Sequence, residues 1–78
     1  MFDSYIRSIL PIPIVNIKFD KTGYLAKITT YSSVADEPQT RKTVEKRVRD
    51  CKRMKSIDGW YFDDDISRKY AIVEMLND

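Results

Sequence analysis

The chain of 78 residues contains no histidine, one cysteine, two glycines and no long hydrophobic run. Without histidine it lacks the usual acid–base residue at neutral pH and a common transition-metal ligand. The two glycines do not form a phosphate-binding glycine-rich loop, and the single cysteine cannot form an internal disulfide or a cysteine-rich zinc site. We therefore predict a protein that is not an enzyme, with no catalytic residues, no cofactor and no metal site.

The lack of a long hydrophobic run and of cysteine pairs also indicates the cellular compartment. No run of 18 or more apolar residues is present, which argues against a membrane-spanning helix. Asp3 and a short apolar patch from Tyr5 to Leu10 make a poor signal peptide. A single cysteine suits a reducing compartment. We predict a cytoplasmic protein without membrane contact.

The length predicts one small domain over residues 1–78. A domain of this size buries only about 60% of the surface that its unfolded chain exposes. A homodimer formed through an exposed strand or helix is therefore as compatible with the sequence as a monomer. Hydrophobic residues at 42% and aromatic residues at 12% are ordinary for a folded protein.

The first 31 residues predict a helix and a β-hairpin. Apolar residues at helical spacing from Phe2 to Leu10 indicate a short helix that Pro11 and Pro13 end. Alternating residues predict strands over 12–19 and 24–31, and Gly23 in the intervening loop supplies a positive-φ position.

The remaining residues predict one long helix and two strands. After a connector over 32–35, Asp36 is a candidate N-cap that Gln39 can complete as a capping box, and Pro38 suits the first turn. The helix is expected to run to about Ile57 and to end at Asp58-Gly59. Strands are expected over 60–62 and 69–75 with a loop over 63–67, although residues 66–76 also fit a helix. The predicted fold is α+β: a short N-terminal helix followed by ββαββ, with one long basic amphipathic helix packed on an antiparallel sheet.

Basic residues align along one side of that helix. Lys42, Lys46, Arg49 and Arg53 are spaced i, i+4, i+7 and i+11, and they lie roughly opposite an apolar stripe of Val44, Val48 and Cys51. Arg41 and Lys52 extend the patch, and Lys55 widens it. A residue on the apolar stripe is expected to be buried, which makes Cys51 a candidate buried thiol.

The positive charge is concentrated in one part of the chain. Residues 40–55 contain eight of the 14 Lys/Arg residues and two of the 12 Asp/Glu residues. Such a face can neutralise phosphates, so we predict nucleic-acid binding, to RNA more than DNA, through the outward basic helix face over 41–55. A solvated helix face without a ligand is the plain alternative.

Aromatic residues offer a second kind of contact. Tyr61 is the candidate for stacking on bases, because strand alternation points it away from Trp60, which is expected in the core. Tyr31 is another possible stacking residue. No signature of a helix-turn-helix, an RNA-recognition motif or a double-stranded RNA domain is recognised.

The acidic residues favour a different partner. Asp58 and the run Asp63 to Asp65 resemble a metal site only in composition, since they lack the spacing of a calcium loop, and a solvated loop is preferred. The alternative function is a protein-docking inhibitor or adaptor, in which the basic helix meets an acidic groove or the acidic loop mimics phosphates.

Overall fold

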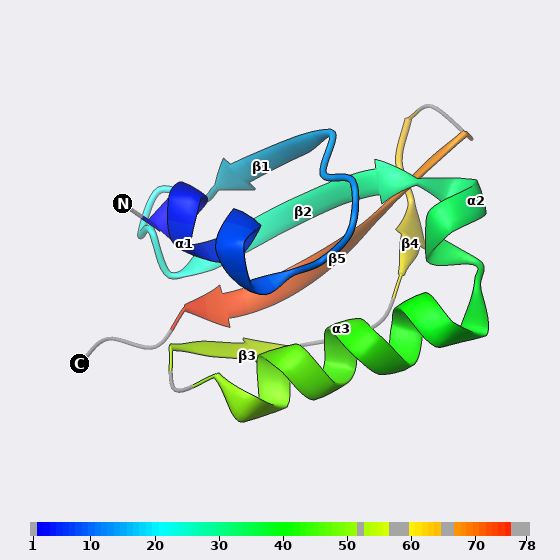
Figure 1. The fold of residues 1–78 in the computed structure, drawn as a ribbon. Helices are drawn as coiled ribbons and strands as arrows, with labels where there is room; N and C mark the ends of the chain where they lie inside the picture. Colours follow the sequence, from blue (N-terminus) through cyan, green and yellow to red (C-terminus); the bar gives the residue numbers. More distant parts are fainter. Residues whose placement is uncertain (1, 52, 57–59, 65–66, 76–78) are drawn as a thin grey trace.

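A computed structural model describes residues 2–51, 53–56, 60–64 and 67–75. Figure 1 shows the arrangement of its helices and strands. In chain order they are α1 (Phe2–Ile9), β1 (Asn16–Phe19), β2 (Leu25–Tyr31), α2 (Ser32–Ala35), α3 (Pro38–Asp50), β3 (Met54–Ser56), β4 (Tyr61–Phe62) and β5 (Arg68–Met75). No helix in the described part of the chain is long and apolar enough to cross a membrane.

The strands form one antiparallel sheet of five strands in the order β1-β2-β5-β3 (Figure 1). The short strand β4 pairs with the same edge of β5 as β3 does, but near the start of β5, whereas β3 pairs with its end. Strand β5 is therefore the centre of the sheet, which confirms the strand prediction over 69–75 against the helical alternative.

The structure confirms the hairpin that was predicted from local turn residues, although β1 begins at Asn16 rather than at residue 12. Gly23 has a φ of +77°, the left-handed region that favours glycine. The side chain of Asp20 accepts hydrogen bonds from the backbone N–H groups of Gly23 and Leu25 and from the Thr22 hydroxyl. These bonds favour the ionised carboxylate, so they hold the pKa of Asp20 below its usual value, with the Thr22 bond as the largest cause.

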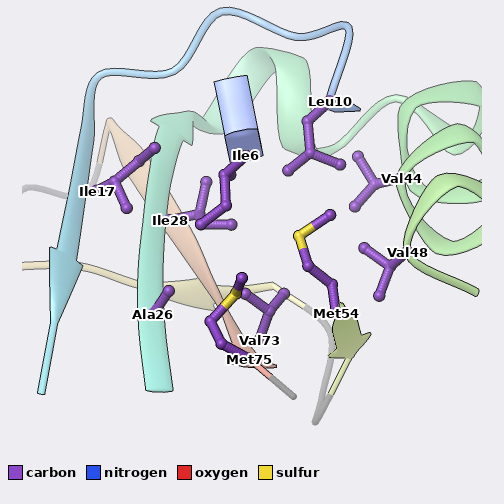
Figure 2. Close-up of a cluster of buried hydrophobic side chains, with 10 residues drawn as sticks. All are labelled: Ile6, Leu10, Ile17, Ala26, Ile28, Val44, Val48, Met54, Val73 and Met75. Atoms are coloured by element: carbon purple, nitrogen blue, oxygen red, sulfur yellow. The ribbon is translucent and has the colours of Figure 1, made fainter. Parts of the chain in front are cut away.

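The hydrophobic core lies between the two longer helices and one face of the sheet. Helix α1 contributes Ile6, and α3 contributes Val44 and Val48 (Figure 2). Leu10, which follows the last residue of α1, is also buried in this core. The sheet contributes Ile17, Ala26, Ile28, Met54, Val73 and Met75. Trp60, predicted to be a core residue, is partly buried and packs against this cluster. Among the described residues, the opposite face of the sheet contributes no side chain to this cluster.

The basic helix is shorter than predicted. It ends at Asp50 rather than near Ile57, and Cys51 after it has extended backbone angles of φ −91° and ψ 130°. Met54 then pairs with Met75 of β5 and is buried, with an exposure of 2%. Extending the sheet and burying Met54 outweigh the helical spacing of the charges. The expected stop at Asp58-Gly59 lies outside the described residues.

The order of elements also differs from the predicted ββαββ. Three strands follow α3 instead of two, and the expected connector over 32–35 is a helical turn, α2. The N-cap of α3 is Glu37 rather than Asp36, and its side chain makes no capping bond. The Asp36 carboxylate instead accepts a hydrogen bond from Lys69 of β5, a long-range pair that local capping rules do not detect.

Candidate nucleic-acid interface

Helix α3 positions the predicted basic face. Pro38 occupies its first turn, where a missing N–H costs nothing, and Arg47 and Arg49 lie in its last turn, where positive charge interacts favourably with the helix dipole. Burial of Val44 and Val48 fixes the rotation of the helix about its axis. Three predicted residues on the opposite side, Lys42, Lys46 and Arg49, are exposed as a result.

The cations of α3 have no partner among the described residues. Five of them are exposed: Arg41, Lys42, Lys46, Arg47 and Arg49. The salt bridges found within the described part of the chain join Arg7 to Asp3, Lys27 to Asp63 and Lys69 to Asp36, and none involves α3. Helix α3 therefore presents exposed cations whose charge is not neutralised by a salt bridge within the described structure, and Lys42, Lys46 and Arg49 form a row along its outward side.

The other predicted basic residues fall outside the helix. Arg53 follows α3 and is exposed, with its guanidinium carbon 5.8 Å from the centre of the Tyr5 ring. Because α3 ends at Asp50, Arg53 does not continue the stripe and instead lies beside α1. Lys52 lies outside the described residues. Lys55 is exposed on β3.

An open groove of about 900 Å³ lies between α1 and α3. Residues of both helices and of the segment after α3 line it, including Tyr5, Ile9, Thr43, Lys46, Arg47 and Cys51. Its apolar surface comes mainly from α1, while α3 supplies cations and polar groups. Lys46 belongs both to this groove and to the basic face, so the two surfaces are continuous.

The thiol of Cys51 is part of this groove rather than of the closed core. The Tyr5 hydroxyl oxygen and the Cys51 sulfur are 2.7 Å apart and share a hydrogen bond that connects α1 to the end of α3. Cys51 is half-buried and packs against the core, whereas the sequence predicted a buried thiol. The residue is thus accessible from the groove.

Tyr61 lies on the sheet face that contributes nothing to the core. Its ring centre is 5.5 Å from that of Tyr70, and its exposure is 37%. The Lys27 ammonium lies 4.4 Å from the centre of the Tyr70 ring and donates to Asp63 at 3.1 Å. The structure therefore does not bring Tyr61 next to Lys42, Lys46 and Arg49. Tyr31, exposed at the end of β2, lies on the same uncovered face.

The acidic run after β4 has a structural role at Asp63. The backbone N–H of Asp64 and the Lys27 ammonium stabilise the ionised Asp63 carboxylate, so its pKa lies below its usual value, with the Asp64 bond as the largest cause. Asp58 and Asp65 lie outside the described residues. Within the described part of the chain, no group of three or more potential ligands could hold a metal ion.

Two functional candidates were missed from sequence. Arg47 lies outside the stripe of Lys42, Lys46 and Arg49, but it follows Lys46 by about 100° around the helix and lines the groove beside α1. Tyr70 carries a signal only through strand alternation: its neighbour Ala71 is buried, so Tyr70 lies on the opposite face of the sheet. The groove itself had no sequence signal, because it depends on where α1 docks.

Comparison with known proteins identifies no relative: no family model, curated protein or solved structure matches this chain.

Proposed function

We propose that this protein binds nucleic acid, RNA more than DNA, through the outward cationic face of α3. The observation that supports this proposal is the set of five exposed cations on one helix, none of which has a described intramolecular partner. A row of like charges costs helix stability, about 0.2–0.5 kcal/mol per i, i+4 pair, unless an anion meets it. A phosphate backbone supplies such anions at regular spacing.

Lys42, Lys46 and Arg49 would make the central phosphate contacts. Arg41 lies at one side of them, and Arg53, with Lys52 beside it in the sequence, would extend the contact past the end of α3. Contacts of this kind bind without reading base sequence and depend strongly on salt, because each one releases counterions. The preference for RNA is proposed because RNA offers unpaired loops and ends to proteins without a major-groove recognition helix.

The proposal includes no catalytic step, cofactor or metal, in keeping with a sequence that has no histidine. Tyr61 stays a proposed stacking residue, and a strand that contacts both Tyr61 and α3 would have to pass around the β3–β4 edge of the sheet. Cytoplasmic location and homodimerisation also stay predictions.

The test is fluorescence anisotropy of labelled RNA and DNA oligonucleotides with the purified, nuclease-treated protein over a range of salt concentrations. We expect saturable binding with a log–log salt slope of about −0.7 per phosphate contact on a single strand. The double variant Lys46→Glu, Arg49→Glu should bind more than about tenfold more weakly at low salt, with an unchanged circular dichroism spectrum.

The matched control is Lys18→Glu, Lys21→Glu, which reverses two exposed cations outside α3 and gives the same net charge. If both double variants lose affinity equally, net charge rather than the α3 face governs binding. If the wild type shows no binding even at low salt, the proposed function is wrong.

A protein partner is the second candidate function. Tyr31 and Tyr61 are exposed on the uncovered face of the sheet, and exposed aromatic side chains are typical of protein interfaces. Phe62, with an exposure of 67%, lies on the other side of β4 and offers a separate aromatic contact. A docking protein would form a stoichiometric complex that survives nuclease treatment and moderate salt. That result, together with no oligonucleotide binding, would favour the inhibitor or adaptor role.

A further inference from the structure

The groove between α1 and α3 combines three kinds of surface in one place. Tyr5 and Ile9 provide apolar surface, while Lys46, Arg47 and Arg53 provide positive charge against one carboxylate, Asp50. Gln39 and Thr43 add an amide and a hydroxyl to the lining of the groove. A ligand that matches all three is flat and apolar with polar edges, and it carries a negative charge.

A nucleotide has this combination of properties. Its base has two apolar faces and hydrogen-bonding edges, and its phosphate is anionic. The groove volume of about 900 Å³ falls within the range of about 300–1,000 Å³ that is usual for sites of small organic ligands. Lys46 belongs to both the groove and the cationic face of α3, so a strand whose backbone follows α3 passes the entrance of the groove.

We infer that this groove receives an unpaired nucleotide of a single strand whose phosphates lie on α3. The inference rests on the proposed function and adds that the site selects single-stranded over double-stranded nucleic acid. The base enters beside Tyr5 and Ile9, its edge meets Gln39 and Thr43, and the flanking phosphates meet Lys46 and Arg47.

The geometry discriminates against a duplex. Paired bases are stacked inside a helix with their Watson–Crick edges occupied, so none can enter a groove between two protein helices without unpairing. A duplex reaches only the outward cations Lys42, Lys46 and Arg49. The single strand therefore gains the base contact in addition to the phosphate contacts.

Affinity gives the first measure of this inference. A single strand of uridines is compared with a blunt-ended duplex of two separate strands that carries the same total number of phosphates and has no unpaired loop, at one salt concentration. The single strand should bind about fivefold more tightly or better, which corresponds to at least one base contact of the stacking kind. Equal or tighter binding of the duplex would overturn the inference while leaving the proposed function intact.

The single cysteine reports on occupancy of the groove. Alkylation of Cys51 by N-ethylmaleimide, followed by mass spectrometry, should slow about fivefold or more when a saturating single strand is bound, and much less with the duplex. The control is Cys51→Ala with Ser33→Cys, which moves the thiol to an exposed position on α2, away from the groove. Its alkylation rate should not change. A bound single strand that leaves Cys51 fully reactive contradicts the inference.

A photocrosslink tests the same contact independently of thiol reactivity. A single strand containing 5-iodouracil is irradiated in complex with the unmodified protein, and the adduct is mapped by peptide sequencing. The expected adduct is on Tyr5. An adduct confined to the sheet-face tyrosines Tyr31, Tyr61 or Tyr70 would place the base on the other side of the molecule and overturn the inference. Absence of any complex would instead count against the proposed function itself.

Discussion

The outward face of α3 and the uncovered face of the sheet both carry cations, yet they use them differently. On the sheet, Lys27 donates to Asp63 and lies over the Tyr70 ring. On α3, neither Lys42 nor Lys46 has a partner among the described residues, although Glu45 and Asp50 lie on the same helix. Lys27 on the sheet face is thus already paired with a carboxylate of the protein, while Lys42 and Lys46 on α3 are available to an anionic ligand.

The difference follows from which groups each element brings together. Strand pairing placed Asp63 near Lys27 by joining residues 36 positions apart in the chain. Helix α3 faces solvent on its outer side, where no other described element supplies an anion. Charge in a sequence is thus no guide to a free binding surface until the fold shows which cations are paired.

The largest expected effect comes from the inner side of α3. Val48→Ala removes buried methyl groups from the core and should lower the free energy of unfolding by about 2 kcal/mol. The adjacent Arg49→Ala removes an exposed side chain and should change it by less than about 0.5 kcal/mol. Urea denaturation measures both. Similar losses from the two changes would show that the faces of α3 are not divided as described.

A smaller effect is expected when an unpaired lysine of α3 is replaced, and replacement of the paired lysine of the sheet is the comparison. Lys42→Met removes a free cation and should weaken binding of a single strand on the order of threefold and reduce the magnitude of its salt slope by about 0.7. Lys27→Met removes a cation already bonded to Asp63, keeps an apolar chain over Tyr70, and should leave affinity nearly unchanged. Anisotropy titrations at several salt concentrations compare the two. A larger loss from Lys27→Met would move the interface to the sheet face.

The smallest expected effect is a change in the stability of the fold at acid pH. The pKa of Asp20 is lowered in the folded protein, so its hydrogen bonds stabilise the fold at pH above the unfolded value of about 3.8, and this contribution is lost as pH falls through the folded pKa. The wild type should therefore lose part of its stability below that pH, while Asp20→Asn should lose less over the same interval. Urea midpoints at neutral and acid pH measure the difference. The effect is modest because Asp20 is exposed.

Elements with local signals could be predicted from sequence. The turn at Gly23 and the prolines after α1 act within a few residues, so the hairpin and the end of the first helix are where the pattern indicated. The apolar spacing of Val44 and Val48 correctly indicated the buried side of α3. Exposure of Lys42, Lys46 and Arg49 follows from that spacing alone.

The end of α3 is different, because helical charge spacing continued past the last helical residue. Whether Met54 extends a helix or joins a sheet depends on β5, which pairs with it from about twenty positions further along the chain. That pairing removed Arg53 from the stripe and brought it to Tyr5. No local property of residues 51–56 carries this information.

The sequence by itself determined the α+β class, the hairpin and the outward cations of α3, because turns and amphipathic spacing act over a few residues. Only the tertiary structure decided where α3 ends, which cations are paired, and that α1 and α3 enclose a groove with Cys51 in it. These features depend on contacts between residues far apart in the chain, and their free energies are settled when the elements pack together.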